Sequence, residues 1–287
     1  MYMRALNHMA APRLGWADFL QLAKALGCVG VEFRNDLPGR LFEGAAPERV
    51  RAATNAAGLR ILALAEVKAF NDWSDARREE AAALIGIAVA CGAEMVSLIA
   101  RNDGKATGRA RRREDLRTAI GELKPLFEAS GLKGLIEPLG FESCALRDKG
   151  EAIEAIESLS AGEQFCIVHD TFHHAVAGGG PVYPEHTGIV HVSGVADPKL
   201  SPAGIRDEHR VLVDQRDQLG NIEQLAGLLA AGYTGPVSFE PFAAEVHALT
   251  DPLQAYAQSF EFVEAELERI DPRGLGKSPT PLRTDAP

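Results

Sequence analysis

The sequence has few cysteines and no long apolar run. Its four cysteines, Cys28, Cys91, Cys144 and Cys166, lie far apart and form no C-x-x-C pair, so a disulfide framework is not expected in a chain of this length. The first residues, MYMRALNHMAAP, do not combine a charged start with an apolar stretch, so no signal peptide is expected. No apolar run approaches membrane-spanning length. These absences predict a soluble, cytoplasmic protein without membrane contact.

The sequence also has fewer basic than acidic residues. The chain has 30 Lys and Arg against 40 Asp and Glu, which gives a formal net charge of −10. Binding to a phosphate backbone needs a basic face, so no nucleic-acid partner is expected. The cluster RARRRED at 109–115 opens a predicted helix, and we interpret it as the solvated first turn of that helix. Because the whole chain is negative, an acidic substrate could be attracted only by arginines close to its binding site.

Short apolar runs alternate with longer amphipathic segments along most of the chain. Runs that are apolar on both faces, separated by helices of crossover length, indicate strands of a parallel sheet. The predicted strands lie at 3–8, 28–33, 60–66, 94–100, 134–138, 164–170, 188–194 and 236–241. The predicted helices lie at 16–27, 74–92, 112–131, 149–160, 221–233 and about 250–270. Several end at a glycine that is expected to cap them, namely Gly27, Gly92, Gly131 and Gly232.

Eight strand–helix units predict an α/β fold of the (β/α)₈ barrel type, whose usual size is about 250 residues. A doubly wound open sheet is the alternative. Such a sheet carries a glycine-rich phosphate loop after its first strand, and HMAAPRLG is not one. We predict one barrel domain over residues 1–268. The tail at 269–287 is rich in proline, glycine and charge, and it is predicted to be extended or disordered, or a strap that contacts a partner.

Charged or imidazole side chains stand at the ends of four successive predicted strands. Glu137 and Asp170 end the fifth and sixth strands, His191 lies in the seventh, and Glu240 ends the eighth. The carboxyl ends of barrel strands share one rim and carry catalytic groups. Burying three carboxylates there is costly without a cation, so we predict one divalent metal ion held by these four residues. The set suits Mn²⁺, Mg²⁺, Co²⁺ or Zn²⁺ and does not choose among them. The alternative is that each acid only caps the following helix.

Three histidines surround Asp170 in the segment HDTFHH, residues 169–174. Asp170 and His173 are three residues apart, so in a helical turn they point the same way. Neighbouring residues in a strand alternate in direction, so His169 is expected to point away from Asp170. We predict that His173 works at the same rim and that His174 faces packed side chains or solvent.

A resemblance to the xylose isomerase-like TIM barrel superfamily is carried by five segments. They are EPLGFESC (137–144), HDTFHHAVAG (169–178), VHVSG (190–194), DEHR (207–210) and GYTGPVSFEPF (232–242). Within the superfamily they are most similar to the 2-keto-myo-inositol isomerases, also called inosose isomerases, and the resemblance covers nearly everything up to about residue 268. It departs at VLVDQRDQLGN, which lacks the Pro-Gly-x-Gly turn common in such barrels.

The resemblance implies the same four metal ligands and adds substrate contacts. It implies that His173 and Arg210 contact substrate oxygens and that Glu32 lines the pocket. Lys68, after the third strand, is expected to belong to the pocket wall. The alternatives are ion pairs, of Glu32 with Arg34 and of Arg210 with Asp207 or Asp214.

The reaction implied by the resemblance is isomerisation of a small polyhydroxy ketone or cyclitol, with 2-keto-myo-inositol in inositol catabolism as the expected case. One of Glu137 and Glu240 removes a proton next to the carbonyl, and the same or the other carboxylate returns a proton to the adjacent carbon. The ion stabilises the enediolate that forms between these steps. A ketose 3-epimerase or an inosose dehydratase would use the same groups, and the sequence does not separate them. Assembly into a homo-oligomer is left open.

Two further readings are less favoured. An abasic-site endonuclease of the same superfamily would use His173 and the Asp207-x-His209 pair in a site with several metals. However, strands two and three end in Glu32–Phe33 and Ala65–Glu66 and not in histidines, and the chain is acidic. A non-catalytic sugar-binding module is disfavoured because all four ligands are present.

Overall fold

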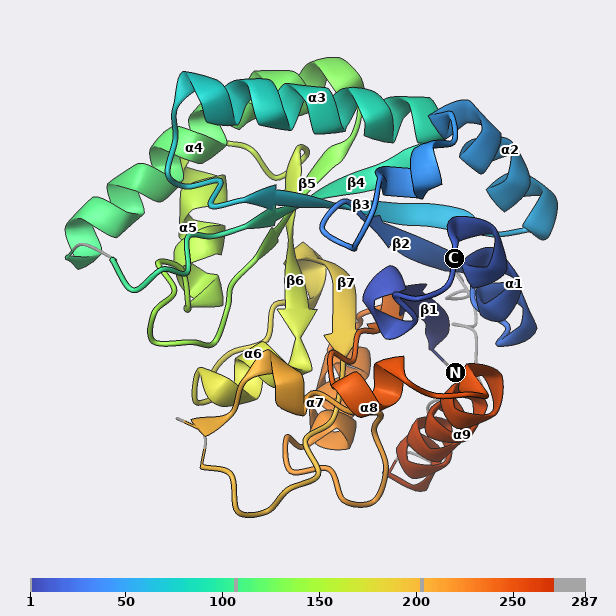
Figure 1. Ribbon diagram of the computed structural model, residues 1–287. Coiled ribbons are helices and arrows are strands. Elements are labelled where there is room, and N and C mark those ends of the chain that lie inside the picture. Colours follow the sequence, from blue (N-terminus) through green and yellow to red (C-terminus); the bar gives the residue numbers. More distant parts are fainter. Residues whose placement is uncertain (1, 106–107, 202–203, 271–287) are drawn as a thin grey trace, which may run out of the picture.

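Eight parallel strands close into a barrel in chain order (Figure 1). The computed structural model describes residues 2–105, 108–201 and 204–270. Strand β8 pairs with β1, from Met3 opposite Pro236 to Leu6 opposite Phe239, which completes the ring. The strands are β1 (Met3–Asn7), β2 (Gly30–Arg34), β3 (Arg60–Lys68), β4 (Ala93–Ile99), β5 (Lys133–Glu137), β6 (Phe165–Asp170), β7 (Thr187–Val192) and β8 (Pro236–Phe239). The predicted (β/α)₈ fold and all eight predicted strands are confirmed.

The helices lie on the outside of the ring of strands (Figure 1). They are α1 (Trp16–Ala25), α2 (Pro47–Ala57), α3 (Asp75–Cys91), α4 (Arg109–Ser130), α5 (Lys149–Ser158), α6 (Thr171–Val176), α7 (Asn221–Ala230), α8 (Ala244–His247) and α9 (Pro252–Ile270). Gly92 and Gly131 cap α3 and α4 in the left-handed conformation, with φ of 74° and 71°, as predicted. Helices α2, α6 and α8 were not predicted. In α2 only Val50 and Thr54 are buried, so this helix shows no apolar stripe in the sequence.

The inside of the barrel is filled by a small apolar cluster. It consists of Ala5, Leu62, Ala63, Met95, Leu135, Cys166, Val168 and Ile189. Leu135, Val168 and Ile189 each stand two positions before a predicted metal ligand in the same strand, namely Glu137, Asp170 and His191. The cluster therefore fills the barrel below the rim and leaves the carboxyl ends of the strands for polar side chains. A much larger cluster packs between the strands and the helices.

Helix α9 is the last element among the described residues. This helix runs to Ile270, so the predicted boundary at residue 268 lies in its last turn. The predicted tail lies outside the described residues, apart from its first two positions. None of the helices within the described ranges has both the length and the apolar content needed to cross a lipid bilayer.

Enlarging a glycine inside the barrel should destabilise the fold. A Cβ atom at Gly188 would lie 2.6 Å from Cys166 Sγ and 3.1 Å from Leu135 Cδ1. We expect Gly188→Val to lower the free energy of unfolding by about 1–3 kcal/mol, because an overpacked core strains its neighbours. Urea denaturation measures this change. Gly227→Ala is the control, since a Cβ at Gly227 in α7 would meet nothing within 4 Å. That variant should be neutral or more stable by up to about 1 kcal/mol. Equal stability of Gly188→Val and the wild type would contradict the packing described here.

Candidate metal centre and its cavity

Four side chains converge at the carboxyl ends of the last four strands. Glu137 ends β5, Asp170 ends β6, His191 lies in β7, and Glu240 directly follows β8. Each offers one ligand atom, all four atoms lie within 4.8 Å of one another, and all four residues are buried. The structure thus brings together the whole set of predicted ligands. Among the residues that the structure describes, this is the one group of at least three potential ligands that could hold a metal ion.

The imidazole of His191 stands among the three carboxylates. Its Nδ1 atom lies 3.3 Å from Glu137 Oε1, 3.3 Å from Glu240 Oε2 and 3.9 Å from Asp170 Oδ2. Three carboxylates and one imidazole form a donor set of the kind that divalent ions such as Mn²⁺ and Zn²⁺ accept. In chemistry and in burial, these residues fit one divalent ion.

Glu32 lies behind His191 and not in the cavity. Its Oε2 atom is 3.1 Å from His191 Nε2, and its Oε1 atom accepts a hydrogen bond of 2.5 Å from Ser238. The side chain is fully buried. The predicted role of Glu32 in lining the pocket is therefore wrong, and so is the alternative pair with Arg34. A carboxylate at Nε2 favours a proton on that nitrogen and leaves Nδ1 for a metal ion.

Arg210 is buried against the metal-ligand group. Its Nη2 group donates to Asp170 Oδ2 over 2.7 Å and to Glu240 Oε2 over 3.0 Å. Its Nε group donates to Ser193 Oγ over 2.8 Å, and Asp207 lies 3.4 Å from Nη1. The predicted pair with Asp207 is present, but Arg210 is only 1% exposed. Arg210 therefore orients two of the carboxylates in addition to lining the cavity.

Aromatic rings enclose the guanidinium of Arg210 and the imidazole of His173. The guanidinium carbon lies 4.8 Å from the ring centre of Phe172 and 4.6 Å from that of Phe242. His173 meets Phe141 and Phe172 edge to face at 5.2 and 5.1 Å. These contacts restrict the rotation of both polar groups. His173 lines the cavity, and its contact with a substrate oxygen stays a prediction.

The segment around Asp170 is arranged as the alternation of side chains predicts. Asp170 caps helix α6 and accepts a hydrogen bond of 2.9 Å from the backbone N–H of His173. His169 faces outward, with Nε2 3.0 Å from Gln224 Oε1. His174 faces packed side chains, and its Nδ1 atom lies 2.7 Å from Lys149 Nζ.

Arg34, which the sequence suggested only as an ion-pair partner, contacts the site directly. Its Nη1 group donates to Glu240 Oε1 over 2.7 Å. Two contacts with Asp36, of 2.8 and 2.9 Å, and one of 3.3 Å with Glu66 hold the guanidinium in place. Arg34 ends β2 and Glu66 lies near the end of β3. Both are charged residues at strand ends, which is the same feature of the sequence that predicted the metal ligands.

Burial and neighbouring charges shift the acidity of the ligands in different directions. Burial raises the pKa of Glu137 to about 7. Burial also acts to raise the pKa of Asp170, but Arg210, His173 and His191 together outweigh it and lower that pKa. For Glu240 the same burial effect is outweighed by His191 and Arg210, and its pKa is lowered. The pKa of His191 is raised, because Glu32, Glu240 and Glu137 outweigh the effect of its burial.

A cavity of about 510 Å³ opens above the four ligands. Lys68 stands in its wall with a side chain that is 62% exposed, and Lys68 Nζ lies 3.2 Å from Glu66 Oε1. Lys68, His173 and Arg210 therefore all line the predicted pocket, whereas Glu32 does not. The cavity is lined by Arg34, Asp36, Glu66, Lys68, Ala69, Asp72, Ile99, Ala100, Arg101, Asn102, Asp103, Glu137, Leu139, Phe141, His173, Asp207, Arg210, Glu240 and Phe242.

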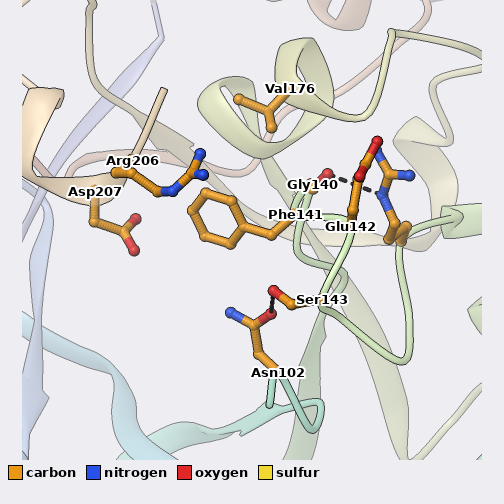
Figure 2. A pocket seen from close by; sticks show the side chains of 9 residues that line it. Asn102, Gly140, Phe141, Glu142, Ser143, Val176, Arg206 and Asp207 are labelled. Atoms are coloured by element: carbon orange, nitrogen blue, oxygen red, sulfur yellow. Dashed lines mark hydrogen bonds between the residues drawn. The ribbon is translucent and has the colours of Figure 1, made fainter. Parts of the chain in front are cut away.

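An outer cavity of about 600 Å³ adjoins the first one and shares Asn102, Phe141 and Asp207 with it. Figure 2 shows the ring of Phe141 in the middle of this space, with Arg206 and Asp207 to one side. Two hydrogen bonds hold other parts of the wall. Ser143 donates to Asn102 Oδ1 over 2.6 Å, and Arg147 donates to the Gly140 carbonyl over 2.9 Å. The two cavities therefore lie on either side of a shared wall that includes Phe141.

A family model for the xylose isomerase-like TIM barrel matches residues 20–266. The chain belongs to this family. The match covers all of the strands after β1 and most of helix α9. A comparison with curated proteins finds no match to this chain.

Several solved structures share the fold of this family member. A xylose isomerase domain-containing protein from Salmonella typhimurium LT2 is 29% identical, with a TM-score of 0.83 over 92% of this chain and 96% of that one. The IolI protein, solved with a bound zinc atom, is 18% identical, with a TM-score of 0.82 over 94% and 99%. An L-ribulose 3-epimerase is 18% identical, with a TM-score of 0.69 over 98% and 100%. At these identities the last two show the fold alone.

Replacing Glu32 should weaken metal binding without touching a ligand. We expect Glu32→Gln to lower the affinity for Mn²⁺ about 10–100-fold, as found for residues that orient metal-binding histidines. Titration calorimetry on metal-free protein measures the affinity. Glu264→Gln is a matched control, since Glu264 pairs with Arg4 far from the rim. Equal affinities in Glu32→Gln and the wild type would show that Glu32 does not orient His191.

Metal binding should tighten as the pH rises. The ion binds the deprotonated forms of Glu137 and His191, whose pKa values are both raised in the metal-free protein. Protons must therefore leave on binding, and affinity should fall as the pH drops from about 7 towards 5. Calorimetry in buffers of different ionisation enthalpy counts the released protons. A pH-independent affinity with no proton release would contradict this assignment.

Proposed function

We propose that this protein is a divalent-metal-dependent isomerase that moves a keto group along a small polyhydroxy ketone or cyclitol, with 2-keto-myo-inositol as the first substrate to test. One observation carries the proposal. Two buried glutamates, Glu137 and Glu240, belong to a group that fits a divalent ion, and both line one cavity together with His173 and Arg210. Proton transfer next to a carbonyl needs carboxylates and a concentrated positive charge at the same place.

Glu137, Asp170, His191 and Glu240 would hold the ion, which would supply the positive charge that proton transfer next to a carbonyl needs. The protein residues carry out the remaining tasks. Glu137 and Glu240 face the substrate and are the groups that remove a proton and return one to the neighbouring carbon. His173 is held between aromatic rings and positions a substrate oxygen.

Arg210 and Arg34 fix the carboxylates at this site. Arg210 holds Asp170 and Glu240, and Arg34 holds the other oxygen of Glu240. Carboxylates that are oriented before the substrate binds need no reorganisation during the reaction, which lowers the barrier.

A second candidate is a ketose 3-epimerase on the same site. The fold likeness to a structure described as an L-ribulose 3-epimerase favours this alternative. The two reactions differ in the fate of the proton. An isomerase returns it to the adjacent carbon, whereas an epimerase returns it to the same carbon from the other face. An abasic-site endonuclease is disfavoured by the net charge of −10 and by the single ligand group among the described residues.

Proton NMR in deuterated water tests the function directly. With Mg²⁺-loaded protein and 2-keto-myo-inositol, we expect deuterium at the carbon next to the carbonyl and the appearance of a second inosose. L-Ribulose and other ketoses are run in parallel. Inversion at one carbon without a shift of the keto group would show that the protein is an epimerase and not an isomerase. No exchange with any ketone would overturn the proposed function.

Two variants test whether the deuterium exchange takes place at the metal-ligand group. Glu137→Gln and Glu240→Gln should each slow deuterium incorporation by at least about 100-fold, the usual contribution of a general acid or base. Glu151→Gln is the control, because Glu151 pairs with Arg109 outside the cavity. An undiminished rate in both glutamine variants would remove these carboxylates as bases.

A further inference from the structure

Every cation that lines the inner cavity is already paired with carboxylates. Arg34 contacts Asp36, Glu66 and Glu240 at 2.8, 3.3 and 2.7 Å. Lys68 Nζ lies 3.2 Å from Glu66 and 3.8 Å from Asp36. The geometry leaves neither group available as an isolated positive charge for a ligand.

The other two cations are paired in the same way. Arg101 lies 3.4 Å from Asp72 and 3.6 Å from Asp103. Arg210 is held by the carboxylates of the metal-ligand group, as described above. An arginine that binds a carboxylate or phosphate on a ligand normally offers its planar face of donors to that group. Here the Nη2 group of Arg210 faces carboxylates of the protein and its Nε group faces Ser193. The Nη1 group of Arg101 faces Asp72, and its Nη2 group donates to the Lys105 carbonyl over 3.3 Å.

The cavity as a whole is negative. With His191 neutral and all carboxylates ionised, as metal binding requires, four cations stand against eight carboxylates. Four negative charges are left, and one divalent ion would offset only two of them. A cavity lined by one sign of charge repels ligands of that sign, and low-dielectric walls strengthen the effect. The eight carboxylates are Asp36, Glu66, Asp72, Asp103, Glu137, Asp207 and Glu240 in the lining and Asp170 in the metal-ligand group.

We propose that the inner cavity selects an uncharged polyol or polyhydroxy ketone and rejects the phosphorylated or carboxylated form of the same molecule. Hydroxyl groups donate hydrogen bonds to the carboxylates of the wall, whereas a phosphate would meet them as a like charge. This selectivity rests on the proposed function, because that proposal supplies the reaction. The selectivity is tested by binding and the reaction by deuterium exchange, so either proposal can fail while the other stands.

The test compares one cyclitol with and without a phosphate. Titration calorimetry on metal-loaded protein measures the Kd of myo-inositol and of myo-inositol 1-phosphate. We expect the phosphate to bind at least about tenfold more weakly, the size of a modest like-charge penalty. The difference should shrink at high salt, because salt screens exposed charges.

A pair of double variants tests whether the wall causes the discrimination. Asp72→Asn with Asp103→Asn removes both carboxylate partners of Arg101. These side chains are 61% and 42% exposed, so the fold should tolerate the change. We expect this variant to bind the phosphate about tenfold better than the wild type does. Glu94→Gln with Glu122→Gln is the matched control. It also frees two arginines from carboxylates and changes the net charge equally, but on the outer surface.

The outcomes are distinct. Equal or tighter binding of the phosphate by the wild type overturns the inference, as does binding of neither cyclitol. Equal behaviour of the two double variants also overturns it, because the effect would then come from the net charge of the whole protein. Binding of myo-inositol with discrimination against the phosphate, together with no deuterium exchange in any ketone, would leave the inference standing and remove the proposed function.

Discussion

Three carboxylates are buried around one imidazole at the carboxyl ends of the strands. Buried carboxylates are unfavourable unless they are paired or bound to a cation. Arg210 and Arg34 pair with Asp170 and Glu240, but Glu137 has only the imidazole of His191 within ion-pair distance among the described residues. The protein's own cations thus leave the group short of positive charge. A divalent ion would supply that charge, and the closed barrel brings the four potential ligand atoms within 4.8 Å of one another.

Most of the fold follows from a simple pattern in the sequence. A strand that is covered by helices outside and by the barrel core inside is apolar on both faces, so all eight strands stand out as short apolar runs. Helix α2 was missed because only two of its residues are buried. Helix α6 has six residues, which is too short to show a helical period. Neither omission affects the rim, because the strands alone decide which residues reach it.

The metal ligands could be predicted because a polar side chain at the end of an apolar run is visible in the sequence. How deep a side chain lies inside the barrel cannot be predicted from the sequence pattern. Glu32 and Arg34 lie two apart on β2, so they face the same side, yet the first lies behind His191 and the second reaches the cavity. The burial of Arg210 also depends on the path of a loop. That loop folds back through the pairing of Gly194 with Val211, a contact that no periodicity indicates.

A barrel of this family does not by itself determine a reaction, because function resides in the site. The central claim is that this site holds one divalent ion. Elemental mass spectrometry of purified protein, dialysed after exposure to Mn²⁺ and Zn²⁺, measures it most directly. We expect one ion per chain in the wild type and none in a variant in which both Asp170 and His191 are replaced by alanine. A wild type that retains no ion, or that retains three, would contradict the central claim.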